Sequence, residues 1–263
     1  MSSNSDALSA ASAGLGRNTA VVAAAGTLAR PDAIARPARA RIIRLVIEIV
    51  VLYMLVPIAM LHMILAWRLP LFTLLPPLLA AFVVMLAVDR GFSFRREILR
   101  TFPPRFIVWT LLTFIVGGGL VALAVQELLP RQFLAFPRDR PEIWQRVMLF
   151  YPLLSVIPQE LAYRTFFFHR YGPLFAGRRW ALILINGLLF GFGHVMFGNW
   201  VAVAGTMATG MLFAFRYDTS RSLAVVWLEH TLWGWLVFTV GLGGYFFTGV
   251  AFQGDFSLPW TWK

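Results

Sequence analysis

The sequence predicts an all-α fold, a polytopic bundle of about seven or eight transmembrane helices. Hydrophobic residues make up 59% of the chain and charged residues only 13%, whereas a typical soluble domain has about half and a quarter. The mean hydropathy is +0.72. Long apolar runs alternate with short segments that contain arginine. The excess of apolar surface therefore indicates that lipid is the solvent of this chain.

The first segment, residues 1–41, is rich in Ala and Ser, contains several arginines and has no long apolar run. Such a segment cannot bury enough apolar surface to fold, so we expect a disordered, basic cytoplasmic tail. A composition rich in Ser and Arg and poor in acidic residues is also typical of an organellar transit peptide. Residues 42–263 are expected to form the transmembrane bundle.

Seven apolar runs predict spanning helices, since about 20 apolar residues cross a bilayer. They lie near residues 45–66, 70–88, 106–128, 144–171, 180–197, 200–216 and 222–242. The fourth run begins as a short apolar stretch, 144–157, and continues into a helical stretch. A last apolar piece, 244–252, is either an eighth span or an interfacial segment.

The basic residues lie mainly in alternate loops, at 90–105, 170–179 and 216–221, and in the tail. Cytoplasmic loops of membrane proteins are rich in Lys and Arg, so we expect a cytoplasmic N-terminus. The net charge of +11 follows from these loops, and nucleic acid is not an expected partner. The chain has no cysteine, which excludes disulfides and a cysteine nucleophile. An arginine-rich, cysteine-free chain suits the bacterial inner membrane.

Three predicted spans carry ionisable residues, which are costly in lipid and therefore indicate a functional site. Glu160 and Arg164 are four residues apart, so they share one helix face and can pair. His194 lies in a glycine-rich span, and Glu229 and His230 are adjacent inside the last span. The structural alternatives are an ion pair that pins a helix and a lone core histidine. A bundle can instead gather all five residues into one polar pocket.

A glutamate with two histidines is typical of a site that activates water. The carboxylate accepts the proton of the water, one imidazole orients the water, and the other stabilises the oxyanion. Glu160, His194 and His230 are also suitable ligands for a zinc ion with an open position. The three residues lie on different predicted helices, so their spacing does not separate these schemes. The expected cofactor is therefore either none or one divalent metal such as zinc.

The order of these residues resembles the CPBP family of intramembrane proteases, which includes CAAX prenyl endopeptidases and bacteriocin-processing or Abi proteins. The family motifs EExxxR, FxxxH and HxxxN correspond here to 159–164, 190–194 and 230–234. The resemblance covers roughly residues 140–242. The expected catalytic residues are Glu160, His194 and His230, with supporting roles for Gln159, Arg164, Phe190 and Glu229.

The chain departs from the family pattern at two positions. Gln159 aligns with the glutamate that is usually regarded as the base, and an amide does not accept a proton at neutral pH. Glu160, or Glu229 beside His230, is left for that role. Gly234 aligns with an asparagine that often helps to bind the oxyanion, and losing one such donor typically costs about 10²–10³ in rate. The candidates for a replacement donor are Trp233, Asn186 and Asn199.

The resemblance implies an intramembrane endopeptidase of the glutamic or metallo type. Its substrate is then a membrane-associated protein or peptide, cleaved by water that Glu and His activate. The alternative is a proteolytically silent scaffold of the same fold that binds and regulates a membrane partner, which Gln159 and Gly234 favour. A third hypothesis, a small transporter with a proton-relay histidine, explains the buried charge but not the order of the motifs.

Overall fold

The described part of this computed structural model, residues 39–97 and 104–246, is almost entirely helical and contains no β-strand. The predicted all-α bundle is therefore confirmed. The predicted tail lies outside the described residues except for its last three, which begin the first helix. Of the possible eighth span, residues 244–246 belong to a 3₁₀ turn and 247–252 lie outside the described residues.

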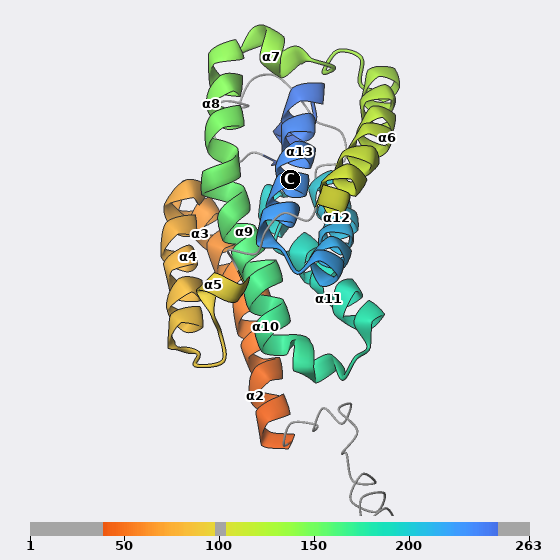
Figure 1. The fold of residues 1–263 in the computed structure, drawn as a ribbon. Helices are drawn as coiled ribbons and strands as arrows, with labels where there is room; N and C mark the ends of the chain where they lie inside the picture. The colour runs from red at the N-terminus through yellow and green to blue at the C-terminus, as the bar shows by residue number, and fades with distance from the viewer. Residues whose placement is uncertain (1–38, 98–103, 247–263) are drawn as a thin grey trace, which may run out of the picture. The chain divides into compact units, whose positions relative to one another are not determined.

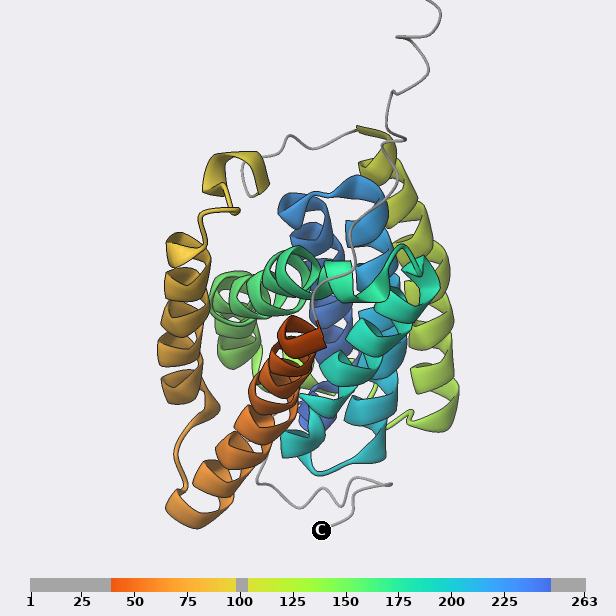
Figure 2. The same cartoon turned by 90° about the horizontal axis from the view of Figure 1, so that it is seen from below.

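Figure 1 shows the helices in chain order. They are α2 (Arg39–Val50), α3 (Val56–Trp67), α4 (Leu71–Val88), α5 (Phe94–Glu97), α6 (Pro104–Leu128), α7 (Ala135–Asp139), α8 (Pro141–Tyr151), α9 (Ile157–Glu160), α10 (Phe167–Tyr171), α11 (Arg179–Phe192), α12 (Trp200–Ser220) and α13 (Leu223–Val240). Helix α13 lies in the middle of the bundle, where it contacts α6, α8 and α12 (Figures 1 and 2).

Within the described residues, four helices are long and apolar enough to cross a membrane, namely Arg39–Trp67, Pro104–Leu128, Arg179–Phe197 and Leu223–Val240. A shorter apolar helix covers Thr73–Val88. The two other predicted spans, 144–171 and 200–216, are helical throughout.

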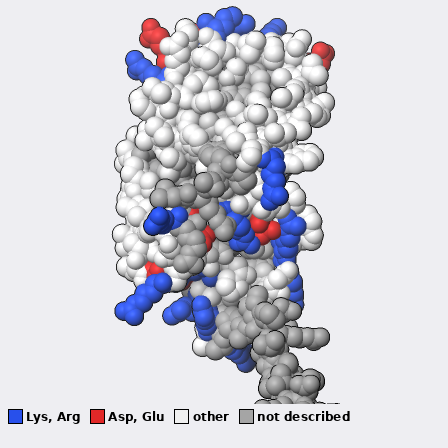
Figure 3. All heavy atoms as spheres, in the orientation of Figure 1, with Lys and Arg blue, Asp and Glu red and all other residues white. Residues whose placement is uncertain are grey.

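The outer surface of these helices is strongly apolar. On α6, for example, the side chains of Trp109, Ile115 and Leu123 are all exposed. Figure 3 shows one face of the molecule, with charged side chains along its upper edge and over its lower half. A broad band without charge lies between them. Lipid covers such a surface without cost, and the protein is an integral membrane protein.

The predicted span 144–171 is one long helix that includes two π-helical turns, Pro152–Val156 and Leu161–Phe166. Prolines in this stretch lack the backbone N–H that an α-helix requires, so the regular ladder is interrupted. The Tyr53 hydroxyl donates a hydrogen bond to the carbonyl of Ala162 in the second turn (2.7 Å). Such π-helical turns are frequent at functional sites, and this one carries Arg164.

Helices α11 and α12 approach each other closely through glycines, as the spacing of Gly187 and Gly191 predicts. A Cβ added at Gly187 would lie 2.8 Å from the backbone nitrogen of Met211 on α12. At Gly191 it would lie 2.9 Å from the backbone nitrogen of Met207. Only glycine permits this separation of the two helices. The separation positions the C-terminal end of α11, and His194 lies just beyond that end.

Candidate active site

Glu160 is the centre of a buried polar network between the long helix and α13. Its side chain is completely buried. One carboxylate oxygen accepts a hydrogen bond from His230 Nδ1 at 2.8 Å. The other lies 3.3 Å from Arg164 Nε, one helical turn away. The predicted pairing of Glu160 with Arg164 is therefore present as an ion pair, although these two atoms form no hydrogen bond.

Arg164 is also completely buried, and its position depends on Asn186 of α11. The guanidinium donates to Asn186 Oδ1 at 2.8 Å, and Asn186 Nδ2 donates to the carbonyl of Tyr163 at 2.6 Å. The guanidinium carbon lies 4.7 Å from the ring centre of Phe190, a cation–π contact. Phe190 therefore packs directly against the network. Asn186 belongs to the same network, and its only signal in the sequence is an amide within an apolar run.

His230 has a defined tautomer because an ionised carboxylate only accepts hydrogen bonds. Nδ1 carries the proton that is shared with Glu160, which leaves the lone pair of Nε2 available. The imidazole stacks on Phe213, with ring centres 4.9 Å apart and an interplanar angle of 25°. The edge of Phe190 packs against it at 5.6 Å. The ring is thus held between aromatic side chains with one free nitrogen.

His194 follows the C-terminal end of α11 and is held by its own helix. Its Nδ1 lies 2.7 Å from the carbonyl oxygen of Phe190. A carbonyl oxygen only accepts, so Nδ1 carries the proton here as well. Nε2 of His194 is therefore also an acceptor in the neutral ring.

His194 and His230 both line one cavity of about 970 Å³. Its polar lining includes Tyr151, Ser155, Gln159, His194 and His230, and most of the remaining lining residues are apolar. A smaller cavity of about 90 Å³ is also lined by Gln159 and His194. Glu160 and Arg164 line neither cavity. The two histidines therefore line the large cavity, and the Glu160–Arg164 pair lies outside its lining.

Gln159 lies at the junction of the two cavities. Its Nε2 donates to Ser155 Oγ at 2.9 Å. Its Oε1 is buried and has no hydrogen-bond partner among the described residues. An unpaired buried acceptor is costly, so this oxygen needs a donor from water or from a ligand.

Glu229 does not join this network, in contrast to the predicted single pocket of five residues. Its carboxylate forms two hydrogen bonds with Arg216 of α12, at 2.7 and 3.0 Å. The same guanidinium donates to Thr113 Oγ1 of α6 at 3.1 Å. Glu229 is completely buried and lines neither cavity. Glu229 and Arg216 together therefore link α13, α12 and α6, outside the cavity that the histidines line.

The predicted metal ligands do not form a suitable cluster. Among the described residues, no group of three or more His, Asp or Glu side chains is arranged to hold a metal ion. Glu160 is engaged by His230 Nδ1 and by Arg164, so its carboxylate is not directed toward the free nitrogens of the two histidines. This donor set does not fit the zinc site that residue types alone suggested.

Two of the three candidates for a replacement donor are occupied elsewhere. Asn186 binds Arg164, and Asn199 accepts from the backbone N–H of Ala202 at the start of α12. Asn199 also donates to the carbonyl of Tyr245. Trp233 remains, because its Nε1 is buried without a partner among the described residues and its side chain lines the large cavity.

These features define a helical membrane protein with a buried Glu–Arg–His network beside a large apolar cavity. Residues 141–236 match the family described as type II CAAX prenyl endopeptidase Rce1-like. The match covers less than half of the chain, and it supports the resemblance to the CPBP family. The family is one of CAAX-type intramembrane proteases, and the matched segment holds all three motifs. Neither the curated proteins nor the solved structures include a significant match to this chain.

Proposed function

We propose that this protein is an intramembrane endopeptidase in which His230, oriented by Glu160, is the base that activates water. The observation that carries this proposal is the 2.8 Å contact between Glu160 and His230 Nδ1. It leaves Nε2 as the free nitrogen of a ring that lines the cavity. A carboxylate that orients a histidine base is the arrangement of the Ser-His-Asp proteases, with water here in place of the serine.

In the proposed reaction, His230 Nε2 accepts a proton from water while the water oxygen forms a bond to the carbonyl carbon of the substrate. The carbonyl oxygen becomes an oxyanion. His230 then returns the proton to the nitrogen of the leaving amine as the C–N bond breaks. Glu160 stabilises the imidazolium that forms between these steps. His194 Nε2 accepts the second hydrogen of the water and so orients the attack.

This scheme assigns the base to a residue other than Gln159. An amide is not a proton acceptor, and Gln159 is bound to Ser155. Glu160 is a poor base because its oxygens face His230 and Arg164. Glu229 is paired with Arg216 and lies outside the cavity lining. His230 is therefore better placed to act as the base than Gln159, Glu160 or Glu229.

For the substrate, we propose a membrane-associated protein or peptide that carries a lipid group. The family description names CAAX prenyl endopeptidases. The cavity of about 970 Å³ is lined mainly by apolar side chains, which suits a hydrocarbon chain beside the scissile peptide. We further propose that the protein lies in a bacterial inner membrane with a cytoplasmic N-terminus, preceding a bundle that begins near residue 42.

The second candidate function is a silent scaffold that binds a membrane partner. The observation that favours it is Gln159, which lines both cavities but has no carboxylate. A dead scaffold of a protease fold should gain peptidase activity from Gln159→Glu. If purified wild-type protein is inactive and Gln159→Glu cleaves, the scaffold is supported against the enzyme.

The proposed activity is tested by mapping protein termini in membranes of three strains: wild type, a deletion, and Glu160→Ala with His194→Ala. A terminus that is present in the wild type and lost in both other strains is the expected result, and it identifies a substrate. Identical termini in all strains, with a double variant that still complements the deletion phenotype, would contradict proteolysis. Immunoblots of the double variant establish that it is inserted at the wild-type level.

A further inference from the structure

The side chain of Tyr151 occupies the space beside Gly234. A Cβ added at Gly234 would lie 2.2 Å from Tyr151 Cε1 and 2.4 Å from the Tyr151 hydroxyl oxygen. A side chain at residue 234 would force the Tyr151 ring to move, so the observed position of Tyr151 requires glycine there. The phenol from α8 thus lies where α13 would otherwise place the side chain of residue 234.

This position is next to His230. Residues 230 and 234 are separated by one helical turn and share one face of α13. The rings of Tyr151 and His230 pack edge to face, with centres 6.0 Å apart. Tyr151 lines the large cavity together with both histidines. Among the described residues its hydroxyl has no hydrogen-bond partner, so its proton is available to a ligand.

The proposed reaction needs hydrogen-bond acceptors for the attacking water and a hydrogen-bond donor for the oxyanion. In the tautomers assigned from their hydrogen-bond partners, both histidines present an Nε2 that accepts. The Gln159 oxygen also accepts. An oxyanion is stabilised only by donors, and a buried donor next to it contributes much more than one in water. A phenol O–H in an apolar cavity fits this need.

We propose that Tyr151 is a catalytic residue whose hydroxyl donates a hydrogen bond to the substrate carbonyl oxygen and to the oxyanion that forms from it. This assignment rests on the proposed peptidase function. No proton is transferred by Tyr151, since its O–H remains intact while the negative charge forms and is lost again. In this chain the donor comes from the long helix rather than from residue 234.

Trp233 is the competing donor, because its indole N–H is buried, unpaired among the described residues and part of the cavity lining. Its six-membered ring, however, packs toward α6. A Cβ added at Gly117 would lie 2.8 Å from Trp233 Cη2, and the ring of Phe114 packs edge to face at 6.0 Å. Tyr151 instead packs directly against His230. Trp233→Phe therefore tests the competing donor.

The test uses the full-length protein in proteoliposomes and a quenched fluorescent peptide with a farnesylated CAAX-type terminus. For Tyr151→Phe we expect kcat to fall about 10²–10³-fold with little change in KM, as for the loss of one oxyanion donor. Tyr245→Phe, which removes a buried phenol hydroxyl outside both cavity linings, should retain kcat within a few-fold. A small effect of Tyr151→Phe together with a large effect of Trp233→Phe overturns the assignment.

A rescue experiment separates the donor from its packing. Tyr151→Ala removes both the ring and the hydroxyl, and the space beside residue 234 opens. Adding Gly234→Asn to Tyr151→Ala supplies a new donor there and should restore kcat at least tenfold over Tyr151→Ala alone. No restoration, with both variants showing wild-type thermal unfolding in detergent, counts against the assignment.

His230→Ala separates failure of this assignment from failure of the proposed function. A wild-type rate that His230→Ala does not change shows that the measured cleavage does not come from the proposed site, and it overturns the proposed function and the role of Tyr151 with it. If His230→Ala abolishes the wild-type rate and Tyr151→Phe leaves it unchanged, only the role of Tyr151 is overturned.

Discussion

Glu160 and Glu229 are both completely buried carboxylates, yet their partners differ in kind. Glu229 accepts two hydrogen bonds from the guanidinium of Arg216, which stays protonated and also donates to Thr113. Glu160 binds one arginine and one histidine, and the histidine lines the cavity. A buried carboxylate beside arginine is a closed pair, whereas a carboxylate that holds an imidazole can stabilise a change of charge on that ring. The proposed mechanism uses the second arrangement.

This difference predicts unequal effects of one conservative change. Glu160→Gln should lower kcat by up to about 10⁴-fold, the loss that follows when the orienting carboxylate is removed from a serine-protease triad. Glu229→Gln should leave kcat within a few-fold. The proteoliposome peptide assay measures both.

The two variants control for each other, because each replaces a buried carboxylate beside an arginine by an amide. Their thermal unfolding in detergent should therefore fall to a similar extent. Equal losses of kcat in Glu160→Gln and Glu229→Gln would show that stability, and not orientation of His230, underlies the effect.

At the scale of elements, the position of His194 depends on the contact between α11 and α12. His194 lies two residues after the end of α11, and its Nδ1 is bound to the last turn of that helix. The two glycines of α11 set the distance between the helices. A change of this distance displaces the end of α11 and with it the imidazole.

Gly187→Ala should destabilise the protein by about 1–3 kcal/mol, the usual cost of overpacking. The new Cβ would lie 2.8 Å from a backbone nitrogen and 3.0 Å from Cα of Met211, and neither can move as a side chain does. Thermal or denaturant unfolding in detergent measures the loss. Gly119→Ala on α6 is the control, because an added Cβ there meets nothing within 4 Å. A Gly187→Ala protein as stable as Gly119→Ala would contradict this account of the packing.

The sequence predicts the helices well because lipid makes hydropathy a strong signal. The Glu160–Arg164 pair follows from spacing on a single helix. The partner of Glu229 does not, because the apolar run of α12 ends at Arg216 and a charged residue there indicates a loop. Helix α12 continues to Ser220, and the ion pair with Glu229 is what makes the buried Arg216 tolerable. The contact between Tyr151 and Gly234 joins two helices that are far apart in the chain. Hydrophobic periodicity describes a single helix, so it does not predict such a contact.

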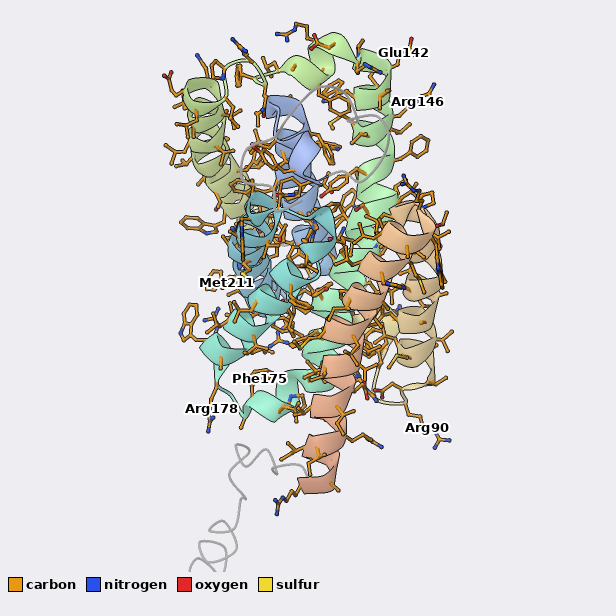
Figure 4. All side chains as sticks on the ribbon, turned by 180° about the vertical axis from the view of Figure 1, so that it is seen from behind. Arg90, Glu142, Arg146, Phe175, Arg178 and Met211 are labelled. Atoms are coloured by element: carbon orange, nitrogen blue, oxygen red, sulfur yellow. The ribbon has the colours of Figure 1, made fainter. Side chains whose placement is uncertain are left out.

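At the scale of the whole molecule, the ends of the bundle differ in their loops. Figure 4 places Arg90 and Arg178 at one end and Glu142 and Arg146 at the other. The large cavity is lined by Arg146 and by Arg68, both exposed, so it extends toward the second end. The loops richest in arginine lie at 90–105 and 170–179. With those loops in the cytoplasm, the cavity opens on the opposite side of the membrane.

The absence of cysteine makes this orientation directly testable, since each introduced cysteine is the only one in the chain. Arg146→Cys should react with an impermeant maleimide in intact spheroplasts. Arg178→Cys, exposed at the other end, should react only after permeabilisation. Labelling of intact spheroplasts at Arg178→Cys but not at Arg146→Cys would reverse the proposed orientation.

The end at which the cavity opens also decides from which side of the membrane water and a peptide reach His230. With a cytoplasmic N-terminus, that side is the outer face of the membrane. Under the proposed function, the peptide bond that is cleaved then belongs to the part of a substrate that has already crossed the bilayer, so cleavage follows translocation.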